Sequence, residues 1–215
     1  MCLKVNEIFY SLQGESSYAG RPCVFVRLTG CNLRCSYCDT KYAYEEGEAL
    51  GIDQILKGVA SYQCSLVEIT GGEPLLQEKT PLLVHRLFQK GYQVLLETNG
   101  TLDIGQLDRR CVKILDVKCP SSGEADRNDF SNLARLTPID EIKFVIGDRQ
   151  DYEYARGILD LEKVSPTTVK AVHFSPVFRK LAPRDLAAWI LEDHLNVRLQ
   201  LQLHKILWDP EKRGI

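Results

Sequence analysis

A chain of 215 residues has room for one sizeable hydrophobic core and is somewhat short for two. Hydrophobic residues make up 44% and charged residues 26%, a globular balance that argues against the disordered, collagen-like and coiled-coil classes. The 27 Lys and Arg residues against 29 Asp and Glu residues give a formal net charge of −2, so no nucleic-acid partner is expected. We therefore expect residues 1–215 to form a single domain.

Neither a membrane span nor a secretory signal is expected from the sequence. No apolar run approaches the length that crosses a bilayer, and the start, Met1–Glu7, reaches polar residues too early for a signal peptide. We therefore expect a cytoplasmic protein with no membrane partner. In such a chain, eight cysteines favour metal or redox chemistry over a disulfide framework.

Strand-like and helix-like segments alternate along the chain. Residues 5–21 have no readable pattern and could form a hairpin at the rim of the fold. Runs rich in β-branched and aromatic residues then predict seven strands, at Val24–Leu28, Leu66–Thr70, Gln93–Glu97, Val112–Val117, Ile142–Ile146, Val169–Phe174 and Val197–Gln202. Helical patterns lie between several of them, at Asp53–Tyr62, Pro81–Lys90, Arg149–Leu161 and Pro183–His194.

This alternation predicts an α/β fold with a parallel sheet, either doubly wound or curled into a full or partial barrel. In both architectures the active site lies at the carboxyl ends of the strands. Polar, glycine-rich or titratable residues follow most of the predicted strands, at Gly30-Cys31, Gly71–Pro74, Thr98–Gly100, Lys118–Ser122, Ser175-Pro176 and Leu203–Lys205. We expect the functional site at this rim.

Three cysteines lie close together directly after the first predicted strand. Cys31, Cys35 and Cys38 have CxxxCxxC spacing, and three thiolates can hold a four-iron cluster while leaving one iron open to an external chelator. A structural zinc site with a distant fourth ligand, or three packed thiols, is the alternative. Zinc sites usually add a second cysteine pair or histidines, and neither lies near this loop in the sequence. The spacing therefore favours an iron–sulfur site.

This cysteine motif resembles that of the radical S-adenosylmethionine (SAM) superfamily, since Tyr37 precedes its last cysteine and Gly71–Pro74 follows the second predicted strand. Further motifs narrow the resemblance to the 7-carboxy-7-deazaguanine synthase family, namely Ser11–Glu15, Cys38–Thr40, Glu68–Pro74, Glu97–Gly100, Asp116–Ser121 and Gln202–Lys205. The resemblance covers the chain from about residue 5 to its end. It implies a modified, incomplete (βα)6 barrel of the radical SAM type, usually homodimeric.

The resemblance also implies a reaction. It is the conversion of 6-carboxy-5,6,7,8-tetrahydropterin to 7-carboxy-7-deazaguanine with loss of ammonia, a carbon–nitrogen lyase step of queuosine and deazapurine biosynthesis. The implied cofactors are a [4Fe–4S] cluster, SAM and Mg²⁺, together with an electron donor that the sequence does not identify. SAM would be cleaved reductively, and hydrogen abstraction at C6 of the pterin would start the ring contraction. Because the cofactor carries this chemistry, no side chain is assigned a catalytic role.

The resemblance assigns site residues by position. Cys31, Cys35 and Cys38 would ligate the cluster, and the Thr40 hydroxyl would bind Mg²⁺, a cation that prefers oxygen. Contacts to SAM would come from Tyr37, Asp39, Gly72, Glu73, Asn99, Lys118, Ser121 and Ser175. Contacts to the pterin substrate would come from Leu12, Gln13, Gly14, Glu15, Arg27, Thr70 and His204.

Without the resemblance, several of these residues have simpler interpretations. Thr40 after Cys-Asp is typical of a turn or helix cap, and Asp39 is the alternative Mg²⁺ ligand. Arg27 could be a surface cation and His204 a partly buried structural histidine.

Two other function classes share the cysteine loop. A glycyl-radical activase would act on a protein partner, and Gln13–Glu15 and Gln202–Lys205 argue against it. A non-catalytic electron carrier or zinc-binding adaptor would have no use for Gly71–Pro74.

Overall fold

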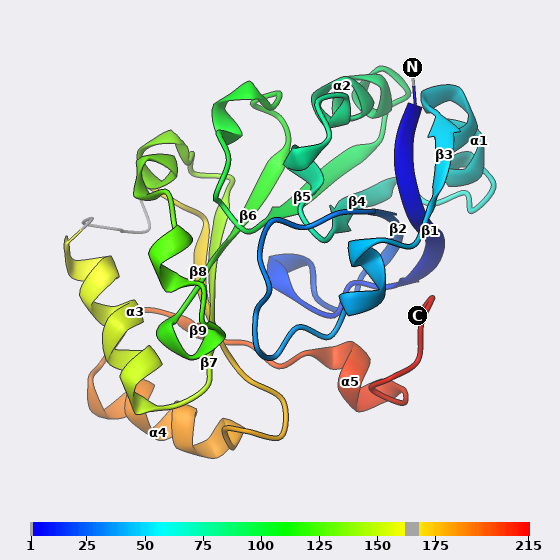
Figure 1. Cartoon of the computed structure of the whole chain (residues 1–215). Coiled ribbons are helices and arrows are strands. Elements are labelled where there is room, and N and C mark those ends of the chain that lie inside the picture. The colour runs from blue at the N-terminus through cyan, green and yellow to red at the C-terminus, as the bar shows by residue number, and fades with distance from the viewer. Residues whose placement is uncertain (1, 162–167) are drawn as a thin grey trace.

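The computed structural model describes residues 2–161 and 168–215, whose arrangement is shown in Figure 1. Their strands form one nine-stranded sheet in the order β3-β1-β2-β4-β5-β6-β7-β8-β9. β1 pairs antiparallel with β2 and β3, whereas every other neighbouring pair is parallel. The strands are β1 (Cys2–Leu12), β2 (Pro22–Leu28), β3 (Glu48–Gly51), β4 (Leu66–Gly71), β5 (Gln93–Thr98), β6 (Val112–Val117), β7 (Glu141–Ile146), β8 (Ala171–Pro176) and β9 (Arg198–Leu199).

All seven predicted strands are confirmed, as β2 and β4 to β9. The last is much shorter than predicted: after Leu199, only the Gln200 amide continues the ladder, bonding to the Phe174 carbonyl oxygen at 2.9 Å, before the chain turns into a helix. The patternless segment at the start is a long strand, β1, which forms a hairpin with β2. The 3₁₀ helix η1 (Ser16–Tyr18) lies in the turn between them.

The four predicted helices are also confirmed, as α1 (Ile52–Ala60), α2 (Thr80–Gln89), α3 (Arg149–Leu161) and α4 (Pro183–Glu192). A short helix, α5 (Leu203–Leu207), follows β9. The connections on either side of β6 contain 3₁₀ helices in place of α-helices, at Ile104–Gln106, Pro120–Ser122, Ala125–Arg127 and Phe130–Arg135. No helix within residues 2–161 and 168–215 is long and apolar enough to cross a membrane.

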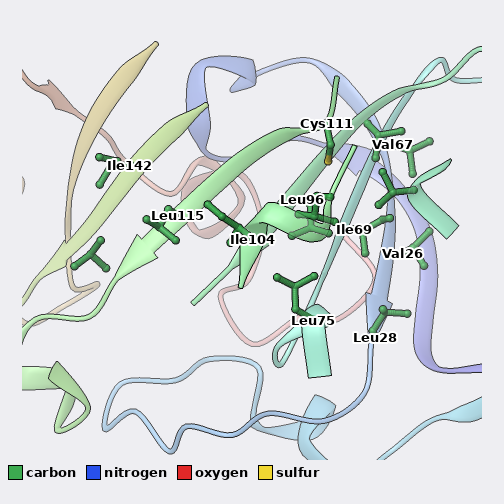
Figure 2. Close-up of a cluster of buried hydrophobic side chains, with 14 of the residues drawn as sticks. Val26, Leu28, Val67, Ile69, Leu75, Leu96, Ile104, Cys111, Leu115 and Ile142 are labelled. Carbon is green, nitrogen blue, oxygen red and sulfur yellow. The ribbon is translucent and has the colours of Figure 1, made fainter. Parts of the chain in front are cut away.

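Two hydrophobic clusters lie on opposite faces of the sheet. The larger one packs the outer strand faces against the helices and connections, and Figure 2 shows part of it: Val26, Leu28, Val67, Ile69, Leu75, Leu96, Ile104 and Leu115. The inner cluster contains alternate residues of the same strands, among them Phe25, Leu66, Leu95 and Ile114. Because side chains alternate along a strand, Phe25 points inward between the outward Val24 and Val26.

The sheet is curved but does not close. β3 and β9 are its two edges in the described part of the chain, so the parallel strands form an incomplete barrel, as the sequence resemblance implied. Toward the carboxyl ends, the inner faces change from apolar to charged: Phe25 is followed by Arg27, Leu66 by Glu68 and Leu95 by Glu97. This change places a polar site above an apolar floor.

Candidate active site

A pocket opens where the parallel strands end, on the inner side of the sheet. The pocket brings together most of the residues assigned from sequence, although they are spread along the whole chain. The assigned residues that line the pocket are Leu12, Gln13, Gly14, Glu15, Arg27, Cys31, Cys35, Tyr37, Cys38, Asp39, Thr40, Thr70, Gly72, Asn99, Lys118 and His204. The site therefore lies at the edge of the sheet expected for a parallel α/β fold.

Three assigned residues, Glu73, Ser121 and Ser175, are not among the lining residues. Ser121 bonds through its backbone N–H to Asp151 Oδ1 at 2.8 Å and through its hydroxyl to the other oxygen of the same carboxylate. The buried hydroxyl of Ser175 has no hydrogen-bond partner in the described part of the chain.

Glu73 is fully buried and supports two loops. Its carboxylate accepts hydrogen bonds from the backbone N–H groups of Leu75 at 2.9 Å and Asn99 at 2.7 Å, and from the Thr98 hydroxyl at 2.9 Å. Burial raises the pKa of Glu73, although these donors oppose the effect. The side chain thus ties the loop after β4 to the end of β5.

The cysteine loop is held by its own backbone and by Arg34. The guanidinium of Arg34 donates to the carbonyl oxygens of Cys31 at 2.8 Å and Leu33 at 2.7 Å. The Cys38 N–H donates to the Cys35 carbonyl oxygen at 3.2 Å. All three loop cysteines are half-buried free thiols that line the pocket.

The arrangement of the thiols fits a cluster better than a single ion. Among the described residues, no three Cys, His, Asp or Glu side chains are grouped so as to hold one metal ion, as a zinc site would require. A four-iron cluster binds three cysteines through three different irons, so its thiolates surround a shared space without meeting at one point. Three thiols that line one pocket satisfy that condition.

Gly72 lies directly against the cysteine loop. A Cβ atom on Gly72 would lie 2.1 Å from the Gly30 carbonyl oxygen and 2.7 Å from the Cys31 Cβ. The next residue, Glu73, donates its backbone N–H to that same Gly30 oxygen at 2.7 Å. Only glycine permits this approach of two backbones beside the cysteine loop.

Asn99 joins the loop after β5 to the cysteine loop. Its amide donates to Asn32 Oδ1 at 3.0 Å, and the Asn32 amide donates to the Thr101 hydroxyl at 2.7 Å. That hydroxyl in turn donates to Asn99 Oδ1 at 2.8 Å, which closes the network. Asn99 is therefore fixed at the pocket wall.

Thr40 occupies the capping position of the 3₁₀ helix η2 (Lys41–Tyr44), yet its side chain makes no capping hydrogen bond. Its hydroxyl lies 3.7 Å from Cys38 Sγ. The neighbouring Asp39 is already paired, with its Oδ2 2.5 Å from Lys205 Nζ. Burial raises the pKa of Asp39, but the Lys205 ammonium outweighs it and keeps the pKa below its usual value.

Arg27 is at the pocket wall near the end of β2. Its Nε donates to Glu7 Oε1 at 2.8 Å, and the rings of Phe9 and Tyr42 flank the guanidinium. The described residues provide no hydrogen-bond partner for its two terminal nitrogens. The group can therefore bind an anion from the pocket side.

The C-terminal helix is seated on the loop after β1. The Leu203 N–H donates to the Gly14 carbonyl oxygen at 3.0 Å, and the Gln202 amide donates to Glu15 Oε1 at 2.8 Å. A Cβ on Gly14 would lie 2.4 Å from His204 Nδ1 and 3.1 Å from the His204 backbone nitrogen, so a side chain at this position would displace His204. Burial lowers the pKa of His204, which favours the neutral imidazole.

The sequence analysis missed four ionisable residues that line the pocket from the strands: Glu68, Glu97, Asp116 and Lys143. They lie on β4, β5, β6 and β7. Glu68, Glu97 and Asp116 were quoted in predicted strands and in the motifs of the resemblance, and Lys143 in a predicted strand, but none was assigned a role. Lys143 Nζ lies 2.9 Å from Glu15 Oε2 and 3.3 Å from Asp116 Oδ2, and it also contacts the Glu97 carboxylate. The signal that could have identified them is a charged residue at a position of a predicted strand whose side chain points to the inner face of the sheet.

The open parallel barrel and the pocket with three thiols define a radical SAM enzyme, and residues 25–118 match the family model described as the radical SAM superfamily. Enzymes of this superfamily use a [4Fe–4S] cluster and SAM. The pocket described above provides three thiols for such a cluster.

The chain belongs to the 7-carboxy-7-deazaguanine synthase family. It is 49% identical over 227 residues to the 7-carboxy-7-deazaguanine synthase of Koribacter versatilis, covering 99% of this chain and 100% of that one. It is 46% identical over 216 residues to the enzyme of the same name from Chlorobaculum tepidum, covering 99% and 97%. The crystal structure of QueE from Escherichia coli shares the fold, with a TM-score of 0.73 over 94% of each chain at 24% identity.

Proposed function

We propose that this chain converts 6-carboxy-5,6,7,8-tetrahydropterin to 7-carboxy-7-deazaguanine with loss of ammonia, in deazapurine and queuosine biosynthesis. The observation that carries the proposal is that one pocket joins the three loop thiols to Glu15, Arg27 and His204. The relatives named 7-carboxy-7-deazaguanine synthase support the same reaction.

In the cofactor half of the pocket, Cys31, Cys35 and Cys38 would hold the [4Fe–4S] cluster. When bound, the cluster would supply the electron that cleaves SAM. Gly72 would let backbone approach the methionyl group, while Asn99 borders the same space. Contacts to SAM would also come from Tyr37, Asp39 and Lys118, and Glu73 would fix the loops that carry Gly72 and Asn99. Ser121 and Ser175, which the sequence resemblance also assigned to SAM, do not line the pocket and would only shape the structure behind its wall.

In the substrate half, Arg27 would bind the pterin carboxylate through its free terminal nitrogens. Burial raises the pKa of Glu15, but Lys143 and His204 outweigh it and lower that pKa to about 2. Glu15 is therefore a carboxylate at neutral pH and can accept hydrogen bonds from the guanidine-like edge of the pterin. Further contacts would come from Leu12, Gln13, Gly14, Thr70 and His204.

We assign Mg²⁺ to the Thr40 hydroxyl, with the substrate carboxylate and water as further ligands. Mg²⁺ prefers oxygen, keeps several waters and commonly takes few protein ligands. The absence of a capping bond from the Thr40 side chain supports this role, as does the pairing of Asp39 with Lys205. The ion would orient the substrate carboxylate.

The family relationship also supports a cytoplasmic homodimer that receives electrons from a separate donor. Light scattering of the reconstituted protein in solution tests the dimer, since a monomeric mass at assay concentrations would contradict it.

The reaction is tested by anaerobic reconstitution with iron and sulfide, followed by incubation with reductant, SAM, Mg²⁺ and the pterin. The parent should give 7-carboxy-7-deazaguanine and ammonia. Cys31→Ala, Cys35→Ala and Cys38→Ala should each lose the cluster absorbance and the product. Cys64→Ala changes a half-buried thiol outside the pocket and should keep both. Formation of 5′-deoxyadenosine without any pterin product would assign the chain to another radical SAM reaction.

A further inference from the structure

Lys143 is a buried cation in the wall of the pocket. Its side chain is only 6% exposed, and its Nζ lies 2.9 Å from Glu15 Oε2 and 3.3 Å from Asp116 Oδ2. The Glu97 carboxylate is a third contact. One ammonium on β7 thus contacts three carboxylates, from the loop after β1, from β5 and from β6.

The three carboxylates need the ammonium to stay ionised and in position, because they are close together and shielded from water. Removing one partner of a buried ion pair leaves an uncompensated charge, which then takes up a proton or shifts position. Here a single removal would affect Glu15, Glu97 and Asp116 together. Asp116 has a second partner, since its Oδ2 lies 2.9 Å from Lys118 Nζ, whereas Glu97 pairs with no other cation among the described residues.

We propose that Lys143 is the positioning residue of the pterin site. By contacting Glu15 and Glu97 it fixes the direction of both carboxylates and keeps Glu15 ionised, so that their remaining lone pairs accept N–H groups of the guanidine-like edge of the pterin. Lys143 acts through these carboxylates and does not itself contact the reacting atoms. This inference rests on the proposed function.

The other charged groups around this cluster come from three elements, β2, β4 and α5. Glu68 on β4 accepts a hydrogen bond from the Gln13 amide, and Arg27 lies at the end of β2. Burial raises the pKa of Glu68 well above its usual value, and repulsion from Glu97 and Glu15 adds to this. From the C-terminal side, His204 and Lys205 on α5 face Glu15 and Asp39. Among the described residues, Lys143 is the cation that forms an ion pair with Glu15.

A second buried lysine in the same sheet provides a matched control. Lys113 on β6 pairs with Asp140, with Nζ and Oδ2 3.0 Å apart and the two side chains 4% and 0% exposed. It is not among the residues that line the pocket. Lys113→Met therefore removes a buried cation of the same type without touching the substrate site.

The test compares Lys143→Met, Lys113→Met and the double variant Lys143→Met/Glu97→Gln, which removes one charge of each sign and so protects folding. Anaerobic calorimetry on the reconstituted proteins gives the Kd for the pterin, with SAM present, at pH 6, 7 and 8. A separate titration gives the Kd for SAM.

Lys143→Met and Lys143→Met/Glu97→Gln should each bind the pterin at least about tenfold more weakly than the parent at pH 7. A loss of this size corresponds to one charge-assisted hydrogen bond. Both variants should bind SAM within about twofold of the parent. The loss should be larger at pH 6 than at pH 8, because Glu15 without its ammonium takes up a proton more readily. The parent and Lys113→Met should show little change across this range. Lys143→Arg, which keeps a cation, should recover part of the affinity.

Parent-like pterin affinity in either Lys143 variant at every pH would overturn this inference alone. An equal loss in Lys113→Met, or a loss in Lys143→Met that is independent of pH, would assign Lys143 a merely structural role. If the parent itself does not bind the pterin, the proposed function fails, and this inference fails with it.

Discussion

Arg27 donates its Nε to Glu7, and its two terminal nitrogens have no partner among the described residues. Arg27→Lys keeps the charge but loses the forked donor that matches a carboxylate. We expect pterin binding to weaken by roughly tenfold, about 1.4 kcal/mol, with SAM binding little changed. Anaerobic calorimetry measures both, and a pterin Kd equal to that of the parent would remove Arg27 from the substrate site.

Thr40 has two interpretations, as a Mg²⁺ ligand and as a turn residue, and two substitutions distinguish them. If its hydroxyl binds Mg²⁺, Thr40→Ser should keep the stimulation of turnover by Mg²⁺, whereas Thr40→Val should lose it and retain the cluster. Because the side chain makes no capping bond, Thr40→Val should cost well under ~1 kcal/mol of stability. Product formation is measured against Mg²⁺ concentration, and an unaltered curve in Thr40→Val is incompatible with ligation.

Glu68 links the charge of the pocket to the stability of the fold. Its pKa is raised by burial and by repulsion from Glu97 and Glu15, so the folded chain binds this proton more tightly than the unfolded chain does. Its contribution to stability is therefore complete below the unfolded pKa and is lost as the pH rises toward the folded pKa. A tenfold tighter binding of this proton by the folded chain corresponds to about 1.4 kcal/mol of stability.

Glu68→Gln keeps an acceptor for the Gln13 amide but cannot ionise. We expect its Tm to match that of the parent near pH 5 and to exceed it at pH 8 by at least ~2–4 °C, the shift expected for about 1 kcal/mol in a chain of this size. Calorimetric melting at several pH values measures the difference. A difference that shrinks as the pH rises would contradict the prediction.

At the scale of elements, the contact between the loop after β4 and the cysteine loop is the most constrained part of the site. Gly72→Ala would place a Cβ 2.1 Å from the Gly30 carbonyl oxygen, so one of the two backbones must move. We expect a loss of about 1–3 kcal/mol in the free energy of unfolding, together with weaker SAM binding. Chemical denaturation and calorimetry measure the two effects.

Gly157 provides the matched control. It lies in α3, where an added Cβ would meet nothing within 4 Å. Gly157→Ala should raise the stability by up to about 1 kcal/mol, because alanine favours the helix, and should leave SAM binding unchanged. If Gly72→Ala behaved in the same way, the close approach of the two loops would be disproved.

Most strands and helices could be predicted because their apolar residues recur at the period of each element. β1 could not, because the polar residues Asn6, Glu7 and Ser11 interrupt the alternation of apolar and polar residues along it. Pairing with β2 and β3, a tertiary property, makes this segment a strand. The 3₁₀ connections around β6 depend on local capping, as by Asp103 and Asp129, which no periodicity reveals.

The candidate site was predictable where a motif follows a strand, because parallel strands bring their carboxyl ends to one edge. That rule brought the cysteine loop, Gly72 and Asn99 together with Lys118. It could not reveal that Glu73 turns away into a network of backbone donors, nor that Ser121 pairs with Asp151. Those outcomes depend on where side chains point after the strand has ended.

At the scale of the whole molecule, the site depends on contacts between the two ends of the chain. Glu15, near the start, accepts a hydrogen bond from Gln202, near the end, and contacts Lys143 in between. Figure 1 shows α5 returning below the sheet toward the C-terminus. The pocket therefore forms only when the barrel strands and the C-terminal segment are both in place.

The central claim is that a single pocket holds the cluster, SAM and the pterin together. An anaerobic crystal structure of the reconstituted protein with SAM and the pterin tests it most directly. We predict a [4Fe–4S] cluster on Cys31, Cys35 and Cys38, with the pterin carboxylate at Arg27 and the guanidine-like edge at Glu15. A cluster on other cysteines, or a pterin bound outside this pocket, would contradict the claim.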